Sequence, residues 1–286
     1  MDGLTWARSS PSDHTNMTVY CLASGSSGNS LLITSDQGAL LVDAGIGVRT
    51  LKRWCGERGV ALENLSGILV THEHGDHSVG AVPLAVRYKV PIVATPGTLA
   101  ALQASDKRDF PVQPLSPGEE TGLGAFGTRA LLTTHDAAEP CGFRVDVGSA
   151  SLVYATDTGS ITPEVRAACC GASLLVIEAN HDIHRLRFGS YSEHLKNRIL
   201  ARTGHLSNNA AADLVLGHTL EHGPAAVWFA HLSEVNNTPG IVRAYWKRRW
   251  QEAGCAASPA VVEIAIRDTP SLVWHQGALA VQKSLF

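Results

Sequence analysis

The stretch THEHGDH (residues 71–77) follows directly on the apolar strand GILVT (residues 67–71). Side chains two positions apart in extended backbone point the same way, so His72 and His74 are expected to converge on one cation. Gly75 permits a sharp turn from the end of this strand into a following helix. The stretch therefore predicts a metal site at a strand-to-helix junction.

Asp76 and His77 come next and would lie at the start of that helix, where they can face a second cation. Two imidazoles beside a carboxylate and another imidazole suit zinc, manganese or iron better than calcium or magnesium. The ordinary alternative is a polar loop with accidental histidines, which would be the better interpretation of a lone histidine. Three histidines and an aspartate within six residues instead favour a cofactor of two divalent metal ions.

Three further candidate ligands each follow an apolar strand: His135 follows ALLTT, Asp157 follows SLVYAT and His231 follows AVWFA. Strand ends along one edge of a sheet are where α/β folds place their chemistry. We therefore expect these three side chains to complete a dinuclear site together with residues 71–77.

This order of residues, H-x-H-x-D-H followed by a distant His, Asp and His, resembles the metallo-β-lactamase superfamily. The resemblance implies that His72, His74 and His135 hold one metal, that Asp76, His77 and His231 hold the other, and that Asp157 bridges them. It also implies that Asp43, at the end of the strand ALLVD, orients the motif loop from behind the ligands. Locally, an Asp that opens a turn before Gly45 explains Asp43 nearly as well.

The rest of the chain alternates strand and helix patterns around the candidate ligands. Residues 18–43 form an antiparallel meander, and amphipathic helices are predicted at 48–58 and 78–88, before a second round of strands and helices. Two sheet-rich halves predict an α/β fold, the four-layer αβ/βα sandwich of the metallo-β-lactamase fold, with two mixed sheets packed face to face and helices outside. We expect a single domain over residues 17–286 after a disordered leader over residues 1–16.

Composition indicates a globular enzyme. Hydrophobic residues make up 44% of the 286 residues, enough for a sizeable core, and the net charge of −3 gives no global sign of nucleic-acid binding. No apolar run approaches the roughly 20 residues that cross a bilayer, and the opening residues lack a signal-peptide pattern. The six cysteines form no C-x-x-C pair, so reduced thiols and a cytoplasmic location are expected. The composition leaves open whether the chain forms a homo-oligomer.

Two later segments point toward phosphodiester chemistry. The strand SLLVIEAN carries Glu178, and GHLSN places His205 at the start of a helix. Together they resemble the paired Glu and Gly-His-Ser motifs of the ribonuclease Z group, in which the pair helps to protonate or orient the departing oxygen. Asp76, Glu178 and His205 are therefore the candidate catalytic residues. In the ordinary alternative, His205 is only a helix-start residue and Glu178 only a strand-end acid.

A closer resemblance covers nearly the whole chain from Val19 onward. The segments LASGSSGNS, IEANHD, GHLSN and HLSEVNNTP together are similar to the bacterial YycJ/WalJ-type family, a nuclease-like branch that acts on DNA ends. The resemblance implies substrate contacts from Ser26, Ser27 and Asn29 in the first segment and from His181 in the second. By itself, the glycine-rich LASGSSGNS would be only a tight turn.

A local excess of positive charge lies between the Glu178 and His205 motifs, where residues 185–202 carry a single acid, Glu193. The residues of this segment that we expect to contact a nucleic acid are Arg185, Arg187, Tyr191, Lys196 and Arg198. The cations would hold phosphates while aromatic rings stack on bases. A solvated helix face is an equally good interpretation of these charges.

Metal-assisted phosphodiester hydrolysis, by a hydroxide that bridges the two metal ions, is the function that these motifs favour. The partner would be nucleic acid, DNA or RNA, cut in an exonuclease-like manner, and no membrane partner is expected. Residues 158–230 are too few for the large inserted domain of the related nucleases that act on messenger RNA ends. The alternatives are a small-molecule or cyclic-phosphate phosphodiesterase of the same fold and, less favoured because all seven ligands are present, a non-catalytic regulatory protein.

Overall fold

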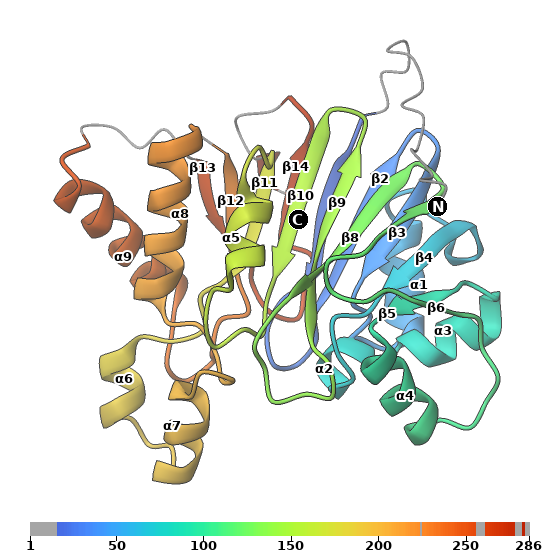
Figure 1. The fold of residues 1–286 in the computed structure, drawn as a ribbon, viewed down its shortest axis with the longest axis horizontal. Coiled ribbons are helices and arrows are strands. Elements are labelled where there is room, and N and C mark those ends of the chain that lie inside the picture. The colour runs from blue at the N-terminus through green and yellow to red at the C-terminus, as the bar shows by residue number, and fades with distance from the viewer. Residues whose placement is uncertain (1–15, 224, 256–260, 278–281, 284–286) are drawn as a thin grey trace, which may run out of the picture.

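The computed structural model describes residues 16–223, 225–255, 261–277 and 282–283. Within these ranges the chain forms two mixed sheets (Figure 1). The leader predicted over residues 1–16 lies outside the described residues, except for Asn16.

The first sheet has eight strands in the order β15-β14-β1-β2-β3-β4-β5-β6. Its strands are β1 (Thr18–Ala23), β2 (Ser30–Ser35), β3 (Gly38–Val42), β4 (Leu65–Leu69), β5 (Ile92–Ala94), β6 (Val112–Pro114), β14 (Leu272–His275) and β15 (Gln282–Lys283). Pairing is antiparallel from β15 to β3 and parallel from β3 to β6. The parallel part brings the carboxyl ends of β3 and β4 to one edge.

The second sheet has seven strands in the order β13-β12-β11-β10-β9-β8-β7. Its strands are β7 (Glu120–Leu123), β8 (Phe126–Leu132), β9 (Cys141–Val147), β10 (Ala150–Ala155), β11 (Leu174–Glu178), β12 (Ala226–Ala230) and β13 (Val261–Ile264). The strands β10 to β13 are parallel neighbours, and the others are antiparallel. Here too the carboxyl ends of β10 and β12, which precede Asp157 and His231, share an edge with that of β11, which carries Glu178.

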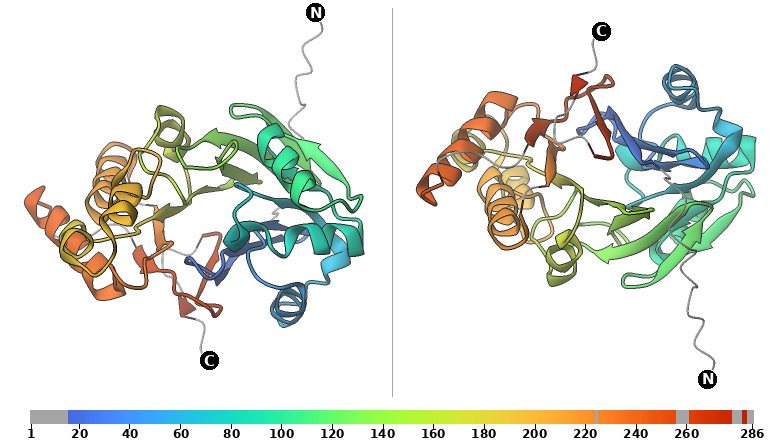
Figure 2. Two further views of the ribbon diagram at one scale, coloured as in Figure 1. Left: turned by 90° about the horizontal axis from the view of Figure 1, so that it is seen from below. Right: turned by 90° about the horizontal axis from the view of Figure 1, so that it is seen from above.

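Three buried apolar clusters show the layering. One cluster lies between the sheets and contains residues of both, such as Leu40 from β3 and Trp228 from β12. The other two join the outer face of each sheet to its helices, with Trp54 on the first sheet and Trp246 on the second. The predicted four-layer sandwich, with sheets face to face and helices outside, is confirmed, and Figure 2 shows the two sheets edge-on.

The helices are α1 (Val48–Gly56), α2 (Gly75–Ser78), α3 (Ala81–Tyr88), α4 (Pro96–Ser105), α5 (Pro163–Cys169), α6 (Ile183–Phe188), α7 (Glu193–Leu200), α8 (Asn208–His222) and α9 (Pro239–Glu252), with a 3₁₀ turn η1 (Leu62–Asn64). Most of the helices from α4 onward begin with a side-chain N-cap. At α8, for example, the Ser207 side-chain oxygen accepts a hydrogen bond from the backbone N–H of Ala210. No helix among the described residues is long and apolar enough to span a membrane.

The helix predicted over residues 78–88 begins later, at Ala81 of α3, because Ser78 ends the short helix α2 and the chain packs tightly between the two helices. The Gly80 N–H donates to the Ala44 carbonyl at 2.7 Å, and a Cβ at Gly80 would lie 2.3 Å from the carbonyl oxygen of Ile46. Gly45 is similarly constrained, since a Cβ there would collide with the Asp76 carbonyl. Gly75, in contrast, has open space around it, so the close approach occurs at Gly45 and Gly80.

Candidate metal centre

Asp43 supports the motif loop from beneath. Its Oδ1 accepts the Thr71 backbone N–H at 2.9 Å, and its Oδ2 accepts Nδ1–H of His77 at 2.7 Å. The phenolic O–H of Tyr154, on the second sheet, also donates to Oδ2, at 3.2 Å. Because Nδ1 of His77 is occupied by this carboxylate, its Nε2 is the nitrogen left for a metal.

The first three predicted ligands form one group. The ligand atoms of His72, His74 and His135 lie within 4.8 Å of one another, and Nε2 of His72 is 3.1 Å from Nδ1 of His74. Nδ1–H of His135 donates to the Gly204 carbonyl at 3.1 Å, so its Nε2, which lies 3.3 Å from Oδ1 of Asp136, is the nitrogen left for a metal. Burial and the adjacent His77 lower the pKa of His72 well below its ordinary value, so this imidazole is neutral, as a metal ligand must be.

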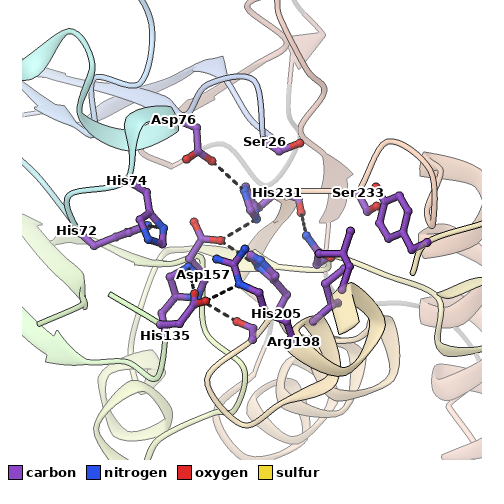
Figure 3. Close-up of a pocket in the computed structure, with 16 residues that line it drawn as sticks. Ser26, His72, His74, Asp76, His135, Asp157, Arg198, His205, His231 and Ser233 are labelled. Atoms are coloured by element: carbon purple, nitrogen blue, oxygen red, sulfur yellow. Dashed lines mark hydrogen bonds and ion pairs between the residues drawn. The ribbon is translucent and has the colours of Figure 1, made fainter. Parts of the chain in front are cut away.

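The remaining predicted ligands form two overlapping groups beside the first. Asp76, His77 and His231 make one, and His72, His77 and Asp157 make the other. Oδ2 of Asp157 lies 2.5 Å from Nε2 of His77. Figure 3 shows Asp157 in the middle of the site, with His72 and His74 on one side and His231 on the other. This central position is the one expected of a bridging ligand.

The donor set fits divalent metal ions. Nε2 of His231 is buried and has no hydrogen-bond partner among the described residues, and the buried Oδ2 of Asp157 has Nε2 of His77 at ion-pair distance. Burial lowers the pKa of His231, but Asp157 and the other acidic neighbours outweigh it and raise that pKa to about 10. Such a region stabilises positive charge, and its imidazole and carboxylate donors suit zinc-like ions.

Glu178 is fully buried and holds two imidazoles at once. Its Oε1 accepts Nδ1–H of His205 at 2.8 Å and Nδ1–H of His231 at 2.9 Å. Its Oε2 accepts the backbone N–H groups of Thr158, at 2.9 Å, and Leu206, at 3.1 Å. Each oxygen of the Glu178 carboxylate thus accepts two hydrogen bonds, and the imidazole rings of His205 and His231 are held in place.

The charges of this pair support each other. Burial raises the pKa of Glu178, but the His205 imidazolium and its hydrogen bond lower it to about 2. Burial lowers the pKa of His205, but the Glu178 carboxylate and the hydrogen bonds of Asp157 and Glu178 raise it well above its ordinary value. Since Nδ1 of His205 is occupied, Nε2 is the nitrogen available in the pocket that this residue lines.

Three residues at strand ends have left-handed backbone, which is uncommon outside glycine: Asp43 at φ 57°, Asp157 at φ 50° and His231 at φ 54°. Long-range contacts hold His231 in this conformation, since its N–H donates to Oγ of Ser24 and its carbonyl accepts from Asn180. The strained turns aim side chains back across the sheet edge instead of along the strand.

A pocket of about 220 Å³ opens onto this centre. Of the predicted substrate contacts, Ser26, Tyr191 and Arg198 line it. Asn29 lies deeper, with its Nδ2 3.0 Å from Nε2 of His77, and Ser27 is exposed and donates to Asp268.

The other predicted substrate contacts lie outside this lining. His181 is buried, with 1% exposure, and Lys196 is also buried and forms an ion pair with Glu193 at 2.9 Å. Arg185 and Arg187 lie exposed on α6.

Sequence reasoning missed Asp136, which also lines the pocket. Its Oδ1 is 3.3 Å from Nε2 of His135, and its Oδ2 accepts Nε–H of Arg198 at 2.5 Å. Its position next to a candidate ligand was the available signal. Asn180 and Ser233 also line the pocket from loops after β11 and β12, and the available signal was their place in the segments IEANHD and HLSEVNNTP that carry the family resemblance.

Comparison with known proteins agrees with this geometry. Residues 39–231 match the family described as the beta-lactamase superfamily domain. The chain is 33% identical over 245 residues to the exodeoxyribonuclease YycJ of Bacillus anthracis, covering 84% of this chain and 91% of YycJ. It is 35% identical over 225 residues to the exodeoxyribonuclease WalJ of Streptococcus pneumoniae, covering 76% of this chain and 81% of WalJ.

Among solved structures, the metallo-beta-lactamase fold protein YhfI from Bacillus subtilis superposes with a TM-score of 0.67 at 21% identity, covering 91% of this chain and 99% of YhfI. This likeness concerns the fold alone. The sequence relatives and the family match each cover most of the chain, and the family match includes all seven candidate ligands. The chain therefore belongs to the beta-lactamase superfamily and is a metal-dependent hydrolase.

Proposed function

We propose that this protein is a nuclease that hydrolyses phosphodiester bonds at the ends of DNA or RNA. The observation that carries the proposal is the hydrogen bond from Nδ1 of His205 to the buried Glu178, beside the candidate metal ligands. A metal site alone would serve many hydrolases. A fixed imidazole with one free nitrogen suits a poor leaving group, such as the sugar oxygen of a nucleotide, which must receive a proton.

Two divalent ions held by the seven ligands would activate water and polarise the phosphoryl oxygens when bound. We assign to Asp157 the position between the two groups of ligands. We assign to Asp76 the role of orienting the attacking water, because the Asp76 carboxylate lines the pocket and lies 3.7 Å from Nε2 of His231. Glu178 aims His205, and Nε2 of His205 delivers the proton to the departing oxygen.

The names of the relatives support a polynucleotide substrate, since YycJ and WalJ are both called exodeoxyribonucleases. The pocket lining supports it as well, because Arg198 and Tyr191 offer a cation and an aromatic ring beside the site. The compact pocket, of about 220 Å³, favours one other candidate, a phosphodiesterase for small or cyclic phosphates.

The test begins with metal analysis of the purified protein, followed by reaction with four substrates: end-labelled single-stranded DNA, duplex DNA, RNA and a 2′,3′-cyclic nucleotide. Successive release of end nucleotides supports the proposal. Turnover of the cyclic phosphate without any cleavage of oligonucleotides supports the second candidate instead. If the metal-loaded protein cleaves none of them, both assignments fail. The Asp157→Ala variant is the control for contaminating nucleases, since its activity should fall to background.

A further inference from the structure

The helix α6 carries the most exposed of the large hydrophobic side chains found among the described residues. Phe188 is 76% exposed, more than Leu220 at 59% or Val79 at 56%. The ring of His184, one turn earlier, lies with its centroid 4.5 Å from that of Phe188. The two exposed rings, tilted by 44° to each other, form an aromatic surface that no described part of the chain covers, although leaving the Phe188 ring in water is unfavourable.

Two cations flank this pair of rings. Arg185 and Arg187 are exposed, and their side chains form no ion pair or hydrogen bond with any residue in the described ranges. In contrast, Lys196 and Arg198 on α7 are paired with Glu193 and Asp136. Of the four cations expected to contact the substrate, Lys196 and Arg198 on α7 are therefore paired, whereas Arg185 and Arg187 on α6 have no such partner among the described residues.

The four side chains share one face of α6. His184 and Phe188 are four residues apart, and each arginine is three residues from one of the two rings, which are the spacings of neighbours on a helix surface. Leu186 is buried on the opposite side. We call the surface of His184, Arg185, Arg187 and Phe188 the α6 face.

The α6 face is held firmly and leads toward the pocket. Asp182 caps the helix by accepting the Arg185 backbone N–H, and its other oxygen accepts the Tyr245 O–H at 2.7 Å. After α6 the chain packs closely, since a Cβ at Gly189 would lie 2.4 Å from the Arg185 carbonyl oxygen. Two residues later Tyr191 lines the pocket. Figure 1 shows α6 and α7 at the same lower edge of the molecule as α2.

We infer that the α6 face binds an unpaired stretch of the nucleic-acid substrate whose end enters the pocket, an inference that rests on the proposed nuclease function. Bases of a single strand expose their flat faces and can stack on Phe188 and His184, while Arg185 and Arg187 contact the adjacent phosphates. Bases inside a duplex are already stacked on each other and offer no such faces. The surface therefore selects single strands and single-stranded overhangs over blunt duplexes.

The test measures affinity of the metal-loaded protein for fluorescent, phosphorothioate-linked oligonucleotides, compared as single strand, overhang duplex and blunt duplex. We expect Phe188→Ala to weaken binding of the single strand and the overhang about 10-fold, and blunt-duplex binding by less than about twofold. Phe188→Tyr should restore the affinity, because it restores a ring. The Arg185→Ala/Arg187→Ala variant should weaken single-strand binding and flatten its salt dependence.

Matched controls separate this surface from general effects. Leu220→Ala removes an exposed apolar side chain from α8, and Arg49→Ala/Arg87→Ala removes two exposed arginines that form no ion pair in the described part of the chain. Neither control should change single-strand affinity. Unchanged single-strand binding in Phe188→Ala, or an equal loss on blunt duplex, would overturn the inference.

Activity measurements distinguish a failure of the α6-face inference from a failure of the proposed nuclease function. Hydrolysis of bis-p-nitrophenyl phosphate and release of nucleotides are measured on the same preparations, and the α6 variants should retain the former. If the unmodified protein degrades oligonucleotides while Phe188→Ala binds them normally, only the α6 face is wrong. If the unmodified protein neither binds nor cleaves oligonucleotides, the α6 inference and the nuclease function both fall.

Discussion

One oxygen of Glu178 accepts hydrogen bonds from both His205 and His231, so a single carboxylate controls a candidate proton donor and a candidate metal ligand. The two roles are separable by mutation. Truncating the imidazole of His205 removes the proton donor and its contact with Asp157, whose Oδ1 lies 3.0 Å from Nδ1 of His205, whereas changing Glu178 alters both rings and the support of a metal ligand.

We expect His205→Ala to slow cleavage of oligonucleotides by about 100- to 10,000-fold, because their leaving oxygen needs a proton. Hydrolysis of bis-p-nitrophenyl phosphate should fall far less, since nitrophenolate leaves without one. Glu178→Gln should in addition weaken metal affinity by about 10- to 100-fold. Steady-state kinetics on both substrates, with metal titrations, check these outcomes. Equal losses on both substrates in His205→Ala would remove this residue from leaving-group protonation.

His181 offers a pH-dependent prediction on stability. Both of its ring nitrogens lack a hydrogen-bond partner among the described residues, and burial lowers its pKa from 6.5 to about 4. The unfolded chain therefore binds a proton between these two values that the folded chain does not, so the free energy of unfolding decreases as pH falls from about 6.5 to about 4.

His181→Leu should remove this contribution, because leucine has no proton to bind and breaks no hydrogen bond of the ring. Urea denaturation at pH 7.5 and at pH 4.5 measures the effect. We expect the stability of His181→Leu relative to the unmodified protein to be greater at the lower pH. A difference that does not vary with pH would contradict the lowered pKa of His181.

At the scale of elements, the ion pair of Asp136 and Arg198 joins the loop after β8 to helix α7 across the mouth of the pocket. Asp136 also lies beside His135. A phosphate entering the pocket must compete with this carboxylate for the guanidinium. The pair therefore limits how strongly Arg198 can hold an anion.

Asp136→Asn should release Arg198 and strengthen oligonucleotide binding by up to about fivefold, since a partly exposed ion pair stabilises by at most about 1 kcal/mol. Arg198→Ala should weaken binding more in the Asp136→Asn background than in the unmodified protein, because the guanidinium no longer has Asp136 as a competing partner there. Affinity measurements on both single variants and the double variant form a thermodynamic cycle. Metal content is measured alongside, and weaker binding in a fully metal-loaded Asp136→Asn would disprove the competition.

At the scale of the molecule, the centre lies where both sheets meet. Asp43 is bound by Tyr154 of the second sheet, and His231 of the second sheet is bound by Ser24, which follows β1 of the first. The apolar cluster between the sheets also contains residues of both. We propose on this basis that residues 17–286 unfold as one unit.

Removing metal should therefore destabilise the whole fold. With metal at roughly 100 times its dissociation constant, binding stabilises the folded state by about 2.7 kcal/mol. For a chain of this size, chelation should lower Tm by about 5 to 10 °C, and the unfolding transition should stay single. Calorimetry before and after dialysis against a chelator, with metal added back, measures this. Two separate transitions would argue against a single domain, and an unchanged Tm against a metal that links the sheets.

The sequence by itself determined the order of the candidate ligands and the strands before them. Each of His72, Asp157 and His231 comes at or just after the end of an apolar run, and an apolar run punctuated by turn residues predicts a strand from local composition. The parallel alternation of strands with helices then brought the end of β4 to one edge of the first sheet and the ends of β10 and β12 to one edge of the second, and the structure places their ligand atoms within 4.8 Å in overlapping groups. Local periodicity was sufficient for this part.

Only the tertiary structure decided which polar groups meet. Glu178 bonds His231 across 53 positions of the chain, and Arg198 bonds Asp136 across 62. It also divided the basic segment, by pairing Arg198 and leaving the charges of α6 unpaired, and it buried His181. The physical reason is that local pattern governs backbone conformation, whereas the pairing of side chains depends on where long-range packing brings distant strand ends and loops together.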